Sequence, residues 1–265
     1  MKEFSKEKRI QGINTVGLFT LIQREVGRFL NVYTQTILAP MVTTLMFYTV
    51  FALAFGGLAR EISGISYMAF ITPGLIMMTM AQNSFANTSS SLIISKVQGN
   101  IVDVLMPPLS AAELYMGYAA GAVCRGLFVG FCTTCLLALF APIQIYSLAA
   151  VFAFAFLGSL MLGTLGIIGG IWSEKFDHIA AVTNFIVTPL TFLSGTFYSI
   201  EMLPELWQKM ALFNPFFYMI DGFRYGFTGI GAEYVGTGLI VLCAINVLLA
   251  LVSYKMIKMG YKIKS

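Results

Sequence analysis

Six long runs of apolar residues restrict the fold of this chain more than any other feature of its sequence. They cover about 31–57, 67–94, 112–140, 148–171, 179–200 and 236–257. A helix needs roughly 20 mostly apolar residues to cross roughly 30 Å of hydrocarbon, where its backbone groups can bond only to one another. Of the 265 residues, 58% are hydrophobic and 11% are charged, which is far outside the range of soluble domains. We therefore expect an all-α, polytopic membrane protein, a single domain over 1–265 with six transmembrane helices.

The distribution of lysine and arginine predicts which side of the membrane each loop faces. Six spans place both termini on one side, and the side richer in these residues is cytoplasmic. Twelve basic residues fall on the side of the termini: Lys2, Lys6, Lys8, Arg9, Arg24, Arg28, Lys96, Lys175, Lys255, Lys258, Lys262 and Lys264. The opposite loops hold Arg60, Lys209 and Arg224. We therefore expect both termini in the cytoplasm. The net charge of +4 is explained by this topology and by attraction to anionic membrane lipid, and we expect no nucleic-acid partner.

Residues 1–30 predict a helix that lies in the cytoplasmic interface. Apolar residues recur there at helical spacing: Phe19, Ile22, Val26, Phe29 and Tyr33. Arg24 and Arg28 occupy another face, from which they could reach lipid phosphates while the aromatic rings enter the acyl boundary. The alternative is an extension of the first span.

The stretch KVQGNIVDVLMPPLS, residues 96–110, is too polar to cross a bilayer and too regular for an idle loop. Val97, Ile101, Val104 and Leu105 have the spacing of one helical face, and Asp103 lies on another. We expect an amphipathic helix whose apolar face is covered, either by a partner protein or by lipid.

Polar residues inside the runs should face protein or water. They are Asn31 and Gln35 in the first run, Asn83, Asn87 and Ser91 in the second, Arg125 in the third, and Asn184, Thr188 and Thr191 in the fifth. They form either hydrogen bonds between helices, worth about 0.6 to 2 kcal/mol each, or the wall of a hydrated path. Arg125 must snorkel, find a partner or attract an anionic group. Glycines four residues apart, such as Gly117 and Gly121, let helices approach closely within one subunit or between two copies.

Residues 201–230 are semi-apolar, rich in aromatic residues and broken by Pro204 and Pro215. A crossing here would put the last span on the wrong side of the membrane. We expect re-entrant helices that dip into the outer leaflet and return, with Trp207 and Tyr218 at head-group depth.

The sequence also limits the chemistry of the chain. It contains no Gly-Lys dipeptide, and so no G-x-x-x-x-G-K-[ST] motif for binding ATP phosphates. His178 is the only histidine, which leaves little basis for a metal site or a nucleophilic triad. We expect no catalytic residue and no metal, and any energy for transport should come from another polypeptide.

The whole plan resembles the ABC type-2 exporter permease family, in particular its short bacterial members with six spans. The run TPLTFLSGTFYSIEMLPELW…NPFFYMIDGFRYG carries most of the resemblance, which covers essentially the whole chain. The third run, with GAVCRGLFVG, is similar to that of the short members. The combination is specific, and it comprises Pro189, Gly195, Leu203, Pro204, Asn214, Pro215, Tyr218 and Arg224.

The resemblance implies roles for these segments. Residues 96–110 would be the segment that couples to the ATPase, through Val97, Ile101, Asp103, Val104 and Leu105. The translocation path would be lined by Asn83, Asn87, Ser91, Arg125, Asn184 and Thr188. An outer gate would comprise Gly195, Tyr198, Pro204, Trp207, Asn214, Pro215, Tyr218 and Arg224, with Phe216 and Phe217 also closing the exit.

It also implies a working assembly. Two copies of this chain would form a homodimer in the bacterial inner membrane and bind two ABC ATP-binding subunits, which carry the ATP and Mg, and this chain would need no cofactor of its own. The expected function is outward export of a lipid, glycan or other amphiphile. The alternatives are a drug or polyketide efflux permease, and an ATP-independent channel or membrane scaffold.

Overall fold

The computed structural model describes residues 12–55, 61–62, 64–141 and 143–262. The first half of the chain contains α1 (Thr15–Asn31), the π-helix η1 (Thr34–Leu38), α2 (Ala39–Phe55), β1 (Glu61–Ile62), β2 (Ile65–Ser66), α3 (Tyr67–Val97), α4 (Ile101–Leu105) and α5 (Ala111–Leu137). The second half contains α6 (Leu148–Trp172), α7 (Phe176–Val182), the π-helix η2 (Thr183–Val187), α8 (Thr188–Phe192), the 3-10 helix η3 (Ile200–Met202), α9 (Glu205–Leu212), α10 (Pro215–Thr228) and α11 (Ala232–Met259). The expected all-α class is confirmed, with one antiparallel pair of two-residue strands added.

Among the described residues, four helices are long and apolar enough to cross a membrane. They are Thr34–Phe55, Ala111–Leu137, Leu148–Trp172 and Ala232–Met259. The predicted second span corresponds to α3, which has 31 residues but carries a polar series through its lower half. The predicted fifth span corresponds to α7, η2 and α8, of 7, 5 and 5 residues. These two elements fall short for different reasons, one in apolarity and one in length, so the six-span topology stays a prediction.

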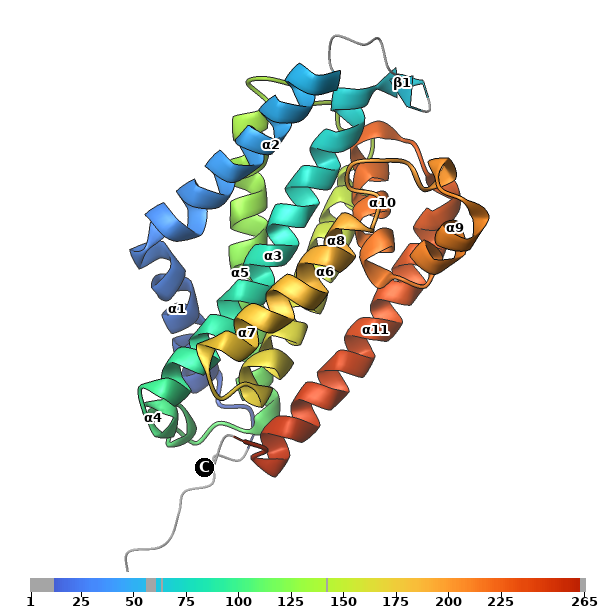
Figure 1. Ribbon diagram of the computed structural model, residues 1–265. Helices are drawn as coiled ribbons and strands as arrows, with labels where there is room; N and C mark the ends of the chain where they lie inside the picture. The colour runs from blue at the N-terminus through green and yellow to red at the C-terminus, as the bar shows by residue number, and fades with distance from the viewer. Residues whose placement is uncertain (1–11, 56–60, 63, 142, 263–265) are drawn as a thin grey trace, which may run out of the picture.

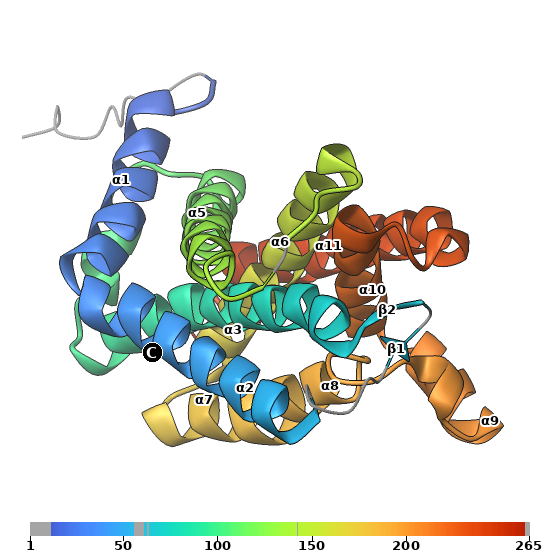
Figure 2. The ribbon, with the colours of Figure 1, turned by 90° about the horizontal axis from the view of Figure 1, so that it is seen from above.

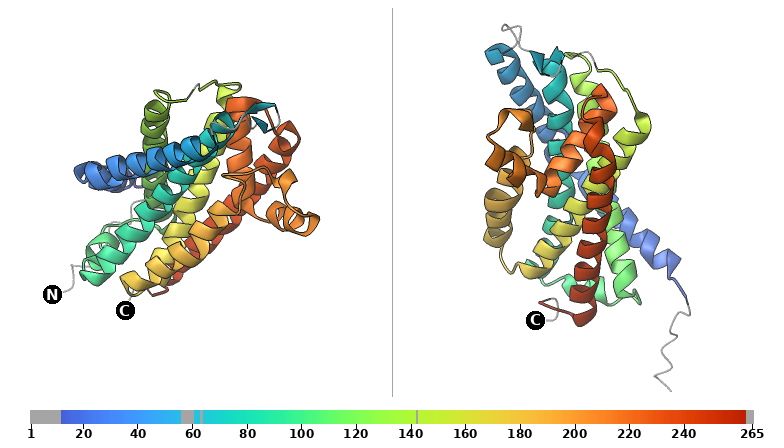
Figure 3. Two further views of the ribbon diagram at one scale, coloured as in Figure 1. Left: turned by 45° about the horizontal axis from the view of Figure 1, so that its top comes forward. Right: turned by 90° about the vertical axis from the view of Figure 1, so that its right-hand side faces the viewer.

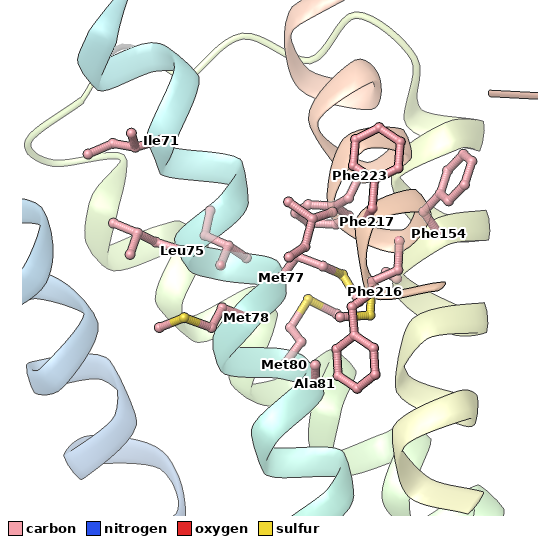
Figure 4. Close-up of a cluster of buried hydrophobic side chains, with 14 of the residues drawn as sticks. Ile71, Leu75, Met77, Met78, Met80, Ala81, Phe154, Phe216, Phe217 and Phe223 are labelled. Carbon is pink, nitrogen blue, oxygen red and sulfur yellow. The ribbon is translucent and has the colours of Figure 1, made fainter. Parts of the chain in front are cut away.

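Helix α3 runs through the centre of the bundle and packs against α2, α5, α6 and α10 (Figures 1 and 2). Its upper half belongs to the main hydrophobic core, together with side chains from α6 and α10. Figure 4 shows Met77 and Met80 of α3 next to Phe216 and Phe217 of α10, with Phe154 of α6 close by. Because α3 is covered on nearly every side, its polar residues face protein or a cavity rather than lipid.

Glycines allow the close approach of these helices. A Cβ on Gly117 or Gly121 of α5 would collide with Leu21 or Glu25 of α1. A Cβ on Gly166 of α6 would collide with Thr88 of α3. The glycine pairs therefore serve packing inside one chain, the first of the two alternatives that the sequence allowed.

The bundle has two distinct ends. One end gathers the start of α1, helix α4, the end of α6 and the end of α11 (Figure 1). Contacts join them there: Asn14 Nδ2 donates to Pro108 O at 3.4 Å, and Lys262 Nζ pairs with Glu174 Oε1 at 2.7 Å. This ammonium holds the pKa of the Glu174 carboxyl below its usual range. The described N-terminal and C-terminal residues thus lie at the same end.

The other end holds the β1–β2 turn, the α5–α6 connection and the corner between α10 and α11, where Tyr146 N–H donates to Gly226 O at 3.0 Å. Helices α9 and α10 occupy the half of the bundle nearest this end (Figures 1 and 3). Four lysines lie toward the opposite end, the one with α4 and the end of α11: Lys96, Lys175, Lys258 and Lys262. This agrees with the prediction that the end with α4 is cytoplasmic. Six basic residues used in the sequence argument fall outside the described residues: Lys2, Lys6, Lys8, Arg9, Arg60 and Lys264.

Candidate functional site

A cavity of about 440 Å³ lies between α2, α3 and α8. Figure 2 shows α2 and the α7–α8 segment on the same side of α3. Residues of α3 form the back wall of the cavity. The polar lining residues are Gln35, Thr43, Thr44, Thr79, Gln82, Asn83 and Thr188. The apolar ones are Ala39, Pro40, Phe47, Met78 and Phe192. The lining offers hydroxyl and carboxamide groups and carries no charged residue.

Hydrogen bonds fix the back wall of this cavity. The hydroxyls of Thr44 and Thr79 lie 2.6 Å apart and join α2 to α3. Asn83 Nδ2 donates to Thr79 O at 2.9 Å, which turns the carboxamide oxygen toward α5. Gln82 and Thr79 were not predicted as lining residues. Both lie within about one helical turn of Asn83, so the helical spacing of the sequence could have indicated them.

Arg125 lies behind Asn83 and does not line the cavity itself. Its Nη2 donates to Asn83 Oδ1 at 2.9 Å, its residue exposure is 7%, and its Nε has no partner. In the described part of the chain, no carboxylate lies within ion-pair distance of it. Arg125 thus finds a polar partner, one of the alternatives that the sequence left open, and the carboxamide of Asn83 lies between it and the cavity.

Asn87 and Ser91 also lie away from the cavity, in a buried polar cluster between α1, α3 and α5. Its centre is Glu25 of α1, whose exposure is 0%. Ser91 Oγ donates to Glu25 Oε1 at 2.8 Å, and Arg28 Nη2 lies 3.3 Å from Oε2. Arg28 Nη2 also donates to the backbone and side-chain oxygens of Asn87. Because α1 covers that stretch of α3, Asn87 and Ser91 face protein groups here, and their place on a path stays a prediction.

The same cluster corrects the interpretation of α1. Arg24 and Arg28 were expected to reach lipid phosphates, but both pair with Glu25, with Arg24 Nη2 at 3.0 Å from Oε1. The outer face of α1 fits the prediction better, since Phe19 and Tyr33 are exposed. Phe29, expected beside them, is buried. Glu25 was not predicted as a functional residue, although an acidic residue between two arginines of an apolar helix was a visible signal.

The predicted coupling segment is not one helix. Helix α3 ends at Val97, a turn follows, and α4 covers only Ile101–Leu105. Val104 is buried, and Ile101 and Leu105 pack with it against Leu114 and Ile171 of the same chain, among others. The apolar face is therefore covered mainly from within. Val97 at 52%, Val102 at 57% and Met106 at 75% exposure, together with the exposed Asp103, form the outer surface of the turn.

Three residues of the predicted outer gate act as anchors. Arg224 of α10 donates from Nε to Phe70 O at 3.2 Å and from Nη2 to Gly195 O, and its guanidinium lies 3.9 Å from the centre of the Phe70 ring. Gly195 has φ +74°, a conformation that favours glycine. Asn214 caps α10 through Phe216 N–H and donates to Ser194 Oγ at 2.8 Å, just before Pro215 at the first helical position.

The remaining gate residues divide between surface and core. Pro204, just before α9, and Trp207 of α9 are exposed. Tyr198 is half-buried, and its hydroxyl donates to Leu193 O at 2.9 Å. By contrast, Phe216, Phe217 and Tyr218 belong to the main core. Helix α10 turns these three toward α6 and α3, so their role in closing an exit stays a prediction. Glu201 and Asp221 line a separate cavity of about 430 Å³ beside α9 and α10.

The path residues of the fifth run also separate. Thr188 lines the cavity, while Asn184 is exposed one turn earlier in η2. Of the six predicted path residues, the structure thus brings Asn83 and Thr188 to one cavity and places Arg125 directly behind it.

Residues 16–228 match the family of ABC-2 type transporters, and the chain belongs to this family. It is thus a transport subunit, and membership implies a partner that binds ATP. Among curated proteins, the chain is 37% identical over 250 residues to the inner membrane transport permease YadH of Escherichia coli K12, covering 94% of this chain and 98% of that protein. It is 23% identical over 205 residues to nodulation protein J of Rhizobium leguminosarum bv. viciae, covering 77% of this chain and 79% of the relative. The resemblance noted in the sequence is confirmed.

Proposed function

We propose that this chain is the permease of an ATP-driven exporter and moves an amphiphilic molecule, such as a lipid or glycan, out of the cytoplasm. Family membership and the two named relatives support transport by a membrane subunit. The name of the E. coli relative supports the inner membrane as its location. The proposal includes six spans, cytoplasmic termini and ATP and Mg held by the partner subunit.

The cavity between α2, α3 and α8 is the observation that carries this proposal. Its uncharged hydrogen-bonding wall suits a polar head group, and Phe47 and Phe192 suit an attached apolar part. Helix α2 and η2 expose apolar side chains beside it, among them Val42, Met46 and Phe185. A second copy of the chain placed against these side chains would close the cavity into a path shared by a homodimer.

Replacing Gln82 by Leu tests this function. The change keeps the size of the side chain but removes its hydrogen-bonding groups from the wall, so transport should fall about tenfold while membrane abundance and copurification of the ATPase stay unchanged. Gln23→Leu, on the exposed face of α1, is the matched control. The substrate would be identified by mass spectrometry of molecules extracted with the purified complex. Wild-type transport by Gln82→Leu, or absence of any copurifying ATPase, would contradict the proposal.

A further inference from the structure

A seven-residue pattern occurs twice in the chain, on the two walls of the cavity. Residues 34–40 read TQTILAP and residues 183–189 read TNFIVTP. Both begin with Thr and a carboxamide residue, both have Ile at the fourth position, and both end in Pro. Each forms a five-residue π-helix, η1 or η2, followed one residue later by the proline. The two segments are thus alike in sequence and in backbone form.

This backbone form leaves the carbonyl of the carboxamide residue without a helical donor. Ala39 N–H bonds to Thr34 O, five residues back, and Pro40 has no N–H to offer to Gln35 O. Likewise, Thr188 N–H bonds to Thr183 O, and Pro189 has no N–H for Asn184 O. No side chain or loop donor within the described residues reaches either oxygen, and neither carboxamide side chain bonds to another described residue.

The direction of both carbonyls relates them to the cavity. Carbonyls of a helix point along the chain toward its C-terminal end, so Gln35 O points toward Ala39 and Pro40, and Asn184 O toward Thr188 and Pro189. Gln35, Ala39, Pro40 and Thr188 line the cavity. A backbone acceptor without a donor is costly in the membrane unless it lines a water-filled or ligand-filled space. Single π-helical turns also occur frequently at functional sites.

We propose that Gln35 O and Asn184 O are paired acceptor sites for the transported molecule, which binds through hydroxyl or N–H donors. The proposal rests on the proposed function, in which this cavity is the transport path. Gln35 also lines the cavity with its carboxamide, so this wall offers one acceptor in the backbone and one adaptable side chain, while the Asn184 side chain is exposed. Because no charged residue lines the cavity, the head group that fits is neutral and rich in hydrogen-bond donors.

The prolines provide the test. Pro40→Ala and Pro189→Ala each add an N–H that can satisfy the free carbonyl, and alanine favours a helix, so both variants should fold. The full chain, with its ATPase, would be placed in lipid nanodiscs. Three probes with short chains would be compared: octyl glucoside offers hydroxyls, octanamide offers N–H groups, and methyl octanoate offers no donor. Pro73→Ala in α3, where no π-helix precedes the proline, is the control.

The expected result is at least a tenfold loss of affinity for a donor-bearing probe in both variants, with methyl octanoate and the control unaffected. A loss confined to octyl glucoside identifies hydroxyls as the donors, and a loss confined to octanamide identifies N–H groups. Equal losses for all three probes would show that the prolines act through shape, and unchanged binding would show that the carbonyls are not used. Either outcome overturns the proposal but leaves the proposed function standing as long as Gln82→Leu still reduces transport.

Discussion

Glu25 is the residue whose burial has the clearest energetic consequence. It is fully buried, accepts from Ser91 and pairs with Arg24 and Arg28. Glu25→Ala would leave both guanidinium groups and the Ser91 hydroxyl without this partner. Breaking a buried pair costs roughly 3 to 5 kcal/mol, and we expect about 3 kcal/mol because the Arg24 side chain is 43% exposed and water can solvate it.

Thermal unfolding of the purified protein in detergent would measure this loss, with Glu205→Ala on the exposed face of α9 as control. A melting temperature equal to that of the wild type would show that the cluster does not hold α1 to α3.

Arg125 acts through Asn83. Its Nη2 holds the Asn83 oxygen, so Arg125→Ala frees the carboxamide to rotate away from its place in the cavity wall. We expect transport to fall about tenfold with less than a twofold loss of membrane abundance. Arg125→Lys, which keeps the charge and can reach the oxygen with one donor, should restore part of the activity. If transport and abundance fall together, Arg125 is a folding residue and has no separate effect on transport.

For single residues, the periodicity of the sequence predicted which side chains share a helical face. It did not predict which other helix packs against that face. Asn83, Asn87 and Ser91 follow one another at four-residue steps, and the sequence treats them alike. The structure separates them because α1 folds back over the lower part of α3 and covers Asn87 and Ser91. That contact joins residues about 60 positions apart, and no local pattern encodes it.

Among the elements, α4 shows why a helical pattern can mislead. Gly99 has φ +76° and ends α3 in the left-handed conformation that favours glycine after a helix. The apolar spacing from Val97 to Leu105 therefore crosses a break, and the two sides of that break have different orientations. Val97 is left exposed, and Val104 is turned into the chain's own core.

This break moves the expected docking surface from Val104 and Leu105 to two exposed apolar residues, Val102 of α4 and Met106 just after it. A carboxylate at Met106 would lie unpaired in the groove of an ATPase, so Met106→Asp should reduce ATPase copurification at least tenfold without loss of membrane abundance. Leu105→Asp should instead lower abundance, because its neighbours belong to the permease itself.

Copurification with a tagged ATPase, compared with the permease level in the same membranes, separates the two effects. Full ATPase binding by Met106→Asp would exclude this turn as the coupling surface.

For the whole molecule, the sequence predicted the all-α class and the four helices that are long and apolar enough to cross a membrane, and it marked the breaks around Pro204 and Pro215. Apolar length is a local property, and prolines mark helix breaks locally as well. The position of α10 was beyond such reasoning, because the contacts of Phe216 and Phe217 with α3 and α6 join distant parts of the chain. An aromatic-rich segment can lie at an interface or in a core, and composition alone does not separate the two.

The orientation of the molecule in the membrane decides which end faces the cytoplasm. It can be tested with labels placed on both halves of the bundle. Glu205 and Lys209 are exposed on α9, and Asp103 is exposed on α4. Helix α4 lies at one end of the bundle, and α9 lies beside the opposite half (Figure 1). The basic residues near α4 predict that this end is cytoplasmic. In intact cells, an impermeant thiol reagent should therefore label Glu205→Cys and Lys209→Cys. It should label Asp103→Cys only after the cells are permeabilised.

The parent chain with its four native cysteines is the control for background labelling. Three of these cysteines, Cys124, Cys135 and Cys243, are exposed on helices long enough to span the membrane. Labelling of Asp103→Cys in intact cells, with protection of both α9 positions, would reverse the topology and with it the direction of transport.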